Sequence, residues 1–155
     1  MALSRRTMLW MVPGATLAVP IGTRLMAQAP APAVNAEDGV AVRGTDVVAY
    51  FTEGRAVAGS PAFTHAWRGA TWRFASAANR DLFAADPDRY APAYGGFCAF
   101  AVSEGYTAPI DPQAWRIVDG RLFLNYDQAI KRRWERDIPG RVARADANWP
   151  RLSAR

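Results

Sequence analysis

Two parts of the chain alternate between hydrophobic and polar residues with a period of two, and each predicts a β-hairpin. The first covers residues 63–74 and turns at an Arg-Gly pair, residues 68–69. The second covers residues 116–124 and turns at residues 119–120, an Asp-Gly pair that favours a type I′ turn. A shorter apolar run, residues 47–51, is interpreted as a strand or a turn.

Helix start signals lie between the two hairpins. Ser76 is a suitable N-cap for a helix whose apolar stripe consists of Ala78, Leu82 and Phe83. Two Asp-Pro pairs, at residues 86–87 and 111–112, combine a capping aspartate with proline at the first helical position. We therefore expect a helix to start at each pair, the first running towards Tyr94.

The end of the chain predicts two helices. Asp127 can cap a helix that places Ile130, Trp134 and Ile138 on one side. A Pro-Gly pair at residues 139–140 should end it, and the residues that follow predict a short terminal helix packing back through Val142, Ala145 and Trp149. Two hairpins with helices between and after them predict a small α+β domain with a C-terminal helical segment.

Residues 1–33 have the composition of an export signal: a basic start, an apolar centre and an Ala/Pro-rich end. The paired Arg5 and Arg6 resemble a twin-arginine signal, so we expect the twin-arginine export machinery as a partner and the periplasm, or another exported location. The alternatives are an ordinary secretory signal and an uncleaved anchor. Cleavage fits after Ala29 or after Ala33. The broken apolar centre is shorter than the roughly 20 residues of a stable membrane span, so we expect none in the mature form.

Residues 34–43 show no clear period and are interpreted as a linker, which leaves residues 44–155 for the domain. The chain has 19 basic and 14 acidic residues; three of the basic ones and none of the acidic ones lie in residues 1–33. The remainder, with 16 basic and 14 acidic residues, has a net charge of only +2. A nucleic-acid partner needs a dense basic face, so this charge argues against one.

Five motifs follow one another between residues 44 and 99. They are Gly-x-Asp-x-Val followed by Tyr-Phe (44–51), Gly-Ala-Thr-Trp-Arg-Phe-Ala-Ser (69–76), Asn-Arg-Asp-Leu-Phe (79–83), Asp-Pro-Asp-Arg-Tyr (86–90) and Tyr-Gly-Gly-Phe-Cys-Ala (94–99). Together they resemble the YHS domain family, in particular its exported, stand-alone bacterial branch. The resemblance extends to about Trp149 and implies a small metal-associated module, of a kind often attached to metal-transporting ATPases or oxygenases.

Metal-associated YHS relatives carry three cysteines that this chain lacks. The matching positions hold Ala49, Ala75 and Asn79. A soft-metal site needs thiolate, imidazole or thioether ligands that converge on one point. The metal site implied by the family therefore does not transfer to these positions.

Cys98 is the only cysteine and His65 the only histidine, so these two are the candidate ligands of a transition metal ion such as copper, zinc or iron. His65 is also expected as a packed histidine on the strand face that carries Phe63 and Trp67. Cys98 is alternatively a small buried residue, a redox-sensitive thiol or a partner in an intermolecular disulfide. The Gly-Gly pair before it, residues 95–96, would let another group approach the backbone closely.

Four aromatic residues are candidates to line a small-molecule pocket or, alternatively, to belong to the core: Tyr90, Tyr94, Phe97 and Tyr106. A single histidine excludes three-histidine zinc hydrolysis, and the chain has no Gly-x-Gly-x-x-Gly, no phosphate loop and no nucleophile elbow. We therefore expect an exported, non-enzymatic YHS-like binding or accessory module, with a small ligand or a protein as partner. The alternatives are a metal-handling protein that uses Cys98 with or without His65, and a thiol-based redox protein.

Overall fold

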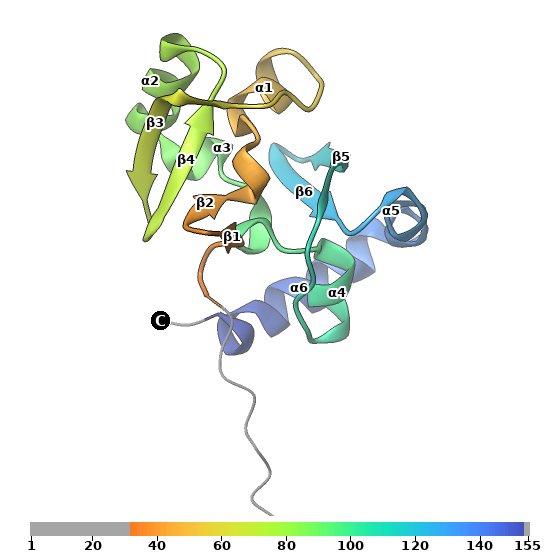
Figure 1. Ribbon diagram of the computed structural model, residues 1–155. Helices are drawn as coiled ribbons and strands as arrows, with labels where there is room; N and C mark the ends of the chain where they lie inside the picture. The colour runs from red at the N-terminus through yellow and green to blue at the C-terminus, as the bar shows by residue number, and fades with distance from the viewer. Residues whose placement is uncertain (1–31, 154–155) are drawn as a thin grey trace, which may run out of the picture.

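The computed structural model describes residues 32–153, which form the predicted α+β domain with two small sheets and a C-terminal helix. The predicted export signal, with Arg5 and Arg6, lies outside the described residues except for its last two positions. Figure 1 shows the four-stranded sheet on one side of the molecule and the two-stranded sheet with the last helices on the other. The elements are β1 (Ala36–Glu37), β2 (Val40–Ala41), η1 (Val42–Gly44), α1 (Val47–Thr52), β3 (Ser60–Trp67), β4 (Ala70–Phe74), α2 (Ala77–Ala85), α3 (Pro87–Tyr90), η2 (Ala93–Gly96), α4 (Ala99–Glu104), β5 (Asp111–Val118), β6 (Arg121–Asn125), α5 (Gln128–Glu135) and α6 (Ile138–Leu152).

Strands β3 and β4 form the first predicted hairpin. Both turn residues take positive φ, 49° at Arg68 and 75° at Gly69. The strand order of the sheet is β1-β2-β4-β3, with β2 parallel to β4, so β3 is an edge strand.

Strands β5 and β6 form the second predicted hairpin, and its Asp-Gly turn has φ values of 49° and 75°, as a type I′ turn requires. However, β5 begins at Asp111, where the sequence predicted a helix start, so that prediction is wrong. The Asp111 carboxylate accepts a hydrogen bond from Gln113 N at 2.9 Å without a helix following. The Tyr50 hydroxyl also donates to Pro112 O at 2.7 Å, which fixes the extended backbone.

The segment predicted as a linker is part of the fold. Residues 34–43 contain β1, β2 and most of η1, and Val34 and Ala41 are buried. Asn35 anchors the segment, because its backbone N donates to Gly95 O at 2.8 Å and its Nδ2 to Gly96 O at 3.1 Å. The linker prediction is wrong because strands of two residues are too short to show a period in the sequence.

Residues 47–51 belong to helix α1 and form neither a strand nor a turn. Asp46 caps the helix through Oδ1, which accepts hydrogen bonds from Val48 N at 2.9 Å and Ala49 N at 3.2 Å. The first four residues of α1 are all buried, so the continuous apolar run reflects burial on every side of a short helix.

Side chains predicted as helix caps act as caps at three of four positions. Ser76, Asp86 and Asp127 each accept a hydrogen bond from the backbone amide three residues later, and they start α2, α3 and α5. Helix α3 ends at Tyr90, earlier than predicted. In the α2 stripe only Phe83 is buried, whereas Ala78 and Leu82 are exposed.

The last helix begins earlier than the sequence indicated. Asp137, a position not singled out in the sequence, accepts a hydrogen bond from Gly140 N at 3.0 Å and caps α6. Ile138 therefore opens α6 and does not belong to α5, and the Pro-Gly pair lies in the first turn of the new helix. Within residues 32–153, no helix has the length and apolar character needed to span a membrane.

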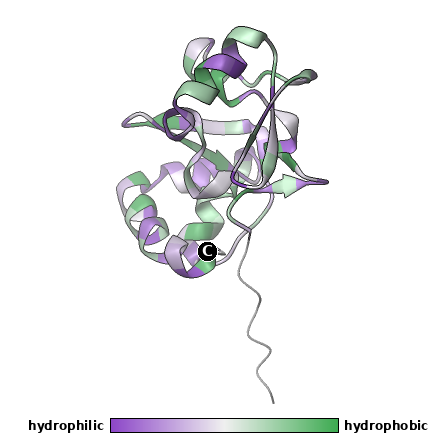
Figure 2. Ribbon diagram, turned by 90° about the vertical axis from the view of Figure 1, so that its left-hand side faces the viewer, coloured by the Kyte–Doolittle hydropathy of each residue, from purple (hydrophilic) through white to green (hydrophobic). Residues whose placement is uncertain are grey.

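The core contains two aromatic clusters, one in each half of the molecule. In the first, the rings of Trp67, Trp72 and Phe74 surround Phe83, with centroid distances of 5.1–5.6 Å. In the second, Phe123 lies between Tyr94 at 6.0 Å and Trp134 at 5.1 Å, and Trp149 contacts Tyr94. Figure 2 shows green and purple residues mixed along the helices beside the C-terminus, and the apolar residues Val142, Trp149 and Leu152 of α6 pack against the core.

Candidate functional site

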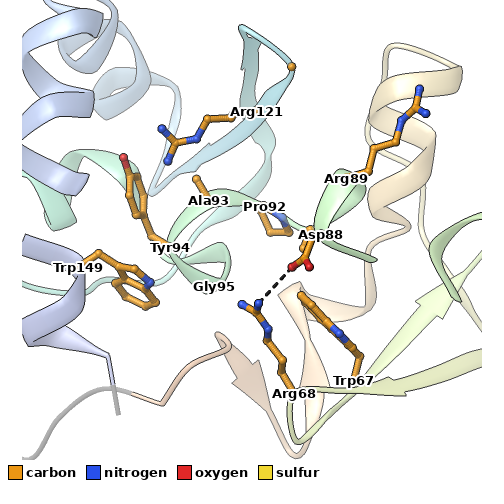
Figure 3. Close-up of a pocket in the computed structure, with 12 residues that line it drawn as sticks. Trp67, Arg68, Asp88, Arg89, Pro92, Ala93, Tyr94, Gly95, Arg121 and Trp149 are labelled. Carbon is orange, nitrogen blue, oxygen red and sulfur yellow. Dashed lines mark hydrogen bonds and ion pairs between the residues drawn. The ribbon is translucent and has the colours of Figure 1, made fainter. Parts of the chain in front are cut away.

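A cleft of about 220 Å³ lies where the two halves of the molecule meet. Trp67 ends β3 and Arg68 follows in the β3–β4 turn, Asp88 and Arg89 come from α3, and the rest of the lining comes from residues 91–95, from the start of β6 and from α6. Figure 3 shows Arg68 and Asp88 on one side of the cleft and the rings of Tyr94 and Trp149 on the other. Partly buried aromatic rings and charged groups therefore face one small space.

One wall is fixed by a network of hydrogen bonds around Asp146. The Arg121 guanidinium donates to both carboxylate oxygens of Asp146, at 2.9 and 3.1 Å, and the Tyr94 hydroxyl donates to Oδ1 at 2.8 Å. The Arg121 hydrogen bonds lower the pKa of Asp146. Burial, followed by the Asp146 contact, raises the pKa of Tyr94 well above its usual value. This network joins η2, β6 and α6 into one rigid surface.

The opposite wall is held by one ion pair and one stacked ring. The Arg68 guanidinium lies 4.3 Å from the centre of the Trp67 ring and donates to Asp88 Oδ1 at 3.1 Å. Trp67 in turn packs edge-on against Trp72 and Phe83 of the first cluster. The Arg68 and Asp88 side chains are 55% and 77% exposed, so water screens this pair strongly.

The lining of the cleft carries more positive than negative charge. Three guanidinium groups line it, those of Arg68, Arg89 and Arg121, against the single carboxylate of Asp88. Arg89 forms no ion pair with any residue in the described part of the chain; its guanidinium lies 5.5 Å from the centre of the Tyr90 ring. Because Asp88 pairs with Arg68 and Asp146 with Arg121, the excess positive charge is the single guanidinium of Arg89, and it favours an anionic ligand.

Cys98 lies at the start of α4 and is 1% exposed. Its Sγ is 3.8 Å from Asn125 Oδ1, and burial raises the pKa of its thiol. A thiol with a raised pKa stays protonated at neutral pH and is a weak nucleophile. The environment agrees with the interpretation of Cys98 as a buried structural residue.

His65 lies on β3, and its ring contacts Phe83 edge-on at 6.0 Å in the first aromatic cluster. Cys98 precedes α4, which lies on the other side of the molecule from β3 in Figure 1. Between residues 32 and 153, no group of three or more His, Cys, Asp or Glu side chains is placed to hold a metal ion. The structure thus gives the two candidate ligands different surroundings.

Only one of the four aromatic pocket candidates lines the cleft. That residue is Tyr94. Tyr90 and Phe97 are buried, in contact with Phe51 and Trp149 respectively, whereas Tyr106 is 51% exposed and lies outside the cleft. Sequence reasoning missed the two cleft arginines that carry ion pairs, although both hairpin turns that border the cleft were predicted.

The Gly-Gly pair before Cys98 is approached by the chain itself. Tyr94, Gly95 and Gly96 all have positive φ, from 59° to 83°. A Cβ on Gly95 would meet the carbonyl of Ala33, and a Cβ on Gly96 would meet the side chain of Val42. The glycines therefore let the N-terminal segment lie directly on η2, at the edge of the cleft.

A second polar centre surrounds Asp46, which is fully buried. Its carboxylate accepts four hydrogen bonds, from the backbone N of residues 48 and 49, from Ala75 N at 2.8 Å and from Asn79 Nδ2 at 2.8 Å. Three of these four donors belong to Ala49, Ala75 and Asn79, which lie on α1, directly after β4 and on α2. The three positions converge on one carboxylate.

Comparison of this chain with protein-family models, with curated proteins and with solved structures finds no match.

Proposed function

We propose that this chain is an exported, non-catalytic binding module of the YHS type, and that it holds a small ligand in the cleft between its two halves. One observation carries the proposal: Trp67, Tyr94, Trp149 and the cleft arginines come from separate parts of the chain and face one space. A volume of about 220 Å³ lies below the range of roughly 300–1,000 Å³ for drug-sized ligands, which favours a small metabolite.

The Asp46 centre supports the YHS part of the proposal. Three positions that carry cysteine in the metal-associated relatives are brought together here, although they lie on α1, after β4 and on α2. In this chain their shared partner is a buried carboxylate that accepts four N–H groups, so the centre is filled by a hydrogen-bond network. A module that has replaced its metal site in this way is expected to act through another surface.

The alternatives to a binding module depend on Cys98. A redox role needs an accessible thiolate, whereas Cys98 is buried and the pKa of its thiol is raised. A metal site shared with His65 needs both side chains at one ion, whereas His65 packs on Phe83 and Cys98 contacts Asn125. These surroundings favour the cleft over the thiol as the functional site.

A thermal-shift screen of the full chain tests the proposal. The screen uses small anionic, neutral and cationic compounds, and a ligand of the cleft raises the melting temperature. We expect Trp149→Ala to abolish the shift and Trp115→Ala to keep it, because Trp115 packs on Tyr50 away from the cleft. Circular dichroism verifies that both variants fold. A panel without any Trp149-dependent ligand, or turnover of a substrate that is lost in Cys98→Ser, would overturn the proposal.

A further inference from the structure

We infer that the ligand of the cleft is a small organic carboxylate with an unsaturated ring, and that its carboxylate replaces Asp88 as the partner of Arg68. This inference rests on the proposed function, because it names the ligand class of the same cleft. Its basis is the difference between two ion pairs at the cleft. Arg121 with Asp146 is called the locked pair, and Arg68 with Asp88 is called the open pair.

The locked pair is Arg121 with Asp146. Two guanidinium nitrogens contact the two carboxylate oxygens, and the Tyr94 hydroxyl takes a third hydrogen bond from the same carboxylate. A bidentate pair of this kind is among the strongest ionic contacts in proteins. Arg121 therefore stays with Asp146 when a ligand enters, and this neutralised pair forms a fixed polar surface at the inner wall.

The open pair is Arg68 with Asp88. It consists of one hydrogen bond of 3.1 Å between two side chains that are more than half exposed. A guanidinium has five N–H donors, so Arg68 keeps most of its donors for another acceptor. A ligand carboxylate can form a two-point contact with it, whereas Asp88 forms one. When the ligand carboxylate takes the place of Asp88, Arg68 therefore forms a stronger ion pair than the one it loses.

The aromatic rings of the cleft determine which chemical group the ligand carries at the end opposite its carboxylate. Arg68 already covers a face of Trp67 and Tyr94 is buried, so the available aromatic surface is that of the partly buried Trp149 on the opposite side. Trp149 contacts the rings of Tyr94 and Phe97 at about 6 Å, which holds its indole in place. A flat ring fits against this wall while its carboxylate reaches Arg68, and aromatic pairs of this kind favour offset or edge contacts.

The charge of the cleft lining determines whether an anionic or a cationic ligand is favoured. Arg89 adds a third guanidinium to the lining, although Figure 3 shows it directed away from Arg68. Arg89 therefore contributes to the electrostatic potential of the cleft and does not contact the ligand directly. A cationic ligand of the same shape would meet the excess positive charge, and a neutral one would not replace Asp88.

Calorimetric titration of the full chain with three probes of one shape tests the inference: benzoate, benzamide and benzamidinium. We expect benzoate to bind most tightly and benzamidinium least, and acetate to bind more weakly than benzoate because it lacks the ring. Arg68→Gln should weaken benzoate binding about tenfold or more, since it removes a charge-assisted contact. Asp88→Asn should tighten it about two- to fivefold, since it removes the competing carboxylate.

Arg80→Gln is the matched control, because Arg80 forms an exposed ion pair with Asp81 at 3.0 Å outside the cleft. It should leave benzoate affinity unchanged. Benzamide or benzamidinium binding as tightly as benzoate, or benzoate affinity unchanged in Arg68→Gln, would overturn the inference. The inference alone also fails if benzoate does not bind while another compound shows a Trp149-dependent thermal shift. If no compound shows such a shift, the proposed function fails with it.

Discussion

Asn79 donates a hydrogen bond of 2.8 Å from its side-chain amide to Oδ2 of the buried Asp46. The contact joins α2 to the cap of α1, and Ala75 N meets the same oxygen from the end of β4. A carboxylate that receives four N–H groups away from water is costly to change, because an amide in its place would put an NH2 group against two of these donors.

Asp46→Asn should therefore lower the free energy of unfolding by about 3 kcal/mol or more. Asn79→Ala should cost about 1–2 kcal/mol, because Asp46 keeps three of its donors. Ser76→Ala, which removes only the cap of α2, should cost about 1 kcal/mol and serves as a control on the same helix. Urea unfolding measures all three. An Asp46→Asn variant as stable as the parent would contradict the central role of this carboxylate.

Cysteines placed at the three positions test whether these side chains converge. We expect the triple variant Ala49→Cys, Ala75→Cys, Asn79→Cys to bind cobalt(II) with the strong absorption of a thiolate complex, because Ala49 N, Ala75 N and the Asn79 side chain all reach the Asp46 carboxylate. The single variant Asn79→Cys should not bind it. A folded triple variant that stays colourless with cobalt would show that these side chains do not converge, and would weaken the YHS interpretation.

The network around Asp146 predicts a loss of stability in acid. The folded-state pKa of Asp146 lies below its ordinary value of 3.8, chiefly because Arg121 donates to the carboxylate. The stabilisation is therefore complete above that ordinary value and disappears as the pH falls through the folded pKa. Asp146→Asn should lower stability at neutral pH by about 1 kcal/mol, since the pair is half exposed. It should also flatten the pH dependence of the melting temperature below pH 3.8; an unchanged slope would contradict the network.

Cys98 should resist modification in the folded protein. Its thiol is buried and its pKa is raised by that burial, so a water-soluble disulfide reagent should react at a rate limited by unfolding. In urea the same thiol should react at once. Stoichiometric reaction of the native protein within seconds would instead favour the redox alternative.

The paired arginines of the leader give a prediction about location. In a bacterium with twin-arginine export, we expect the chain with Arg5→Lys and Arg6→Lys to stay inside the cell at its full-length mass, whereas the parent is exported and shortened after Ala29 or Ala33. Immunoblots of periplasmic and cytoplasmic fractions measure the outcome. Normal export of the double variant would favour an ordinary secretory signal.

Local signals allowed much of the fold to be predicted. Both hairpins follow from alternation around Arg-Gly and Asp-Gly turns, and Ser76, Asp86 and Asp127 start helices because a cap acts within three residues. Asp111 carried the same Asp-Pro signal as Asp86 and yet starts a strand, since pairing with β6 outweighs a local preference. The strands β1 and β2 could not be predicted, because two residues show no period and β2 depends on pairing with β4, which is distant in the sequence.

The candidate site was much harder to predict than the fold. Among the expected pocket residues only Tyr94 lines the cleft, because Tyr90 and Phe97 point into the core. Arg68 and Arg121 sit beside turns, where a charged residue has no distinctive pattern in the sequence. Their common function depends on the packing of the two halves of the molecule, and that packing determines which turns face one another.

The indole N–H resonances of the tryptophans give the most direct test of the cleft as the ligand site. The full chain is labelled with nitrogen-15, its six indole signals are assigned by single Trp→Phe variants, and benzoate is added stepwise. We expect the largest shifts at Trp67 and Trp149, which line the cleft, and none at Trp115 or Trp134, which lie outside it. Shifts spread evenly over all the indoles, or centred on Trp115, would contradict a ligand site in this cleft.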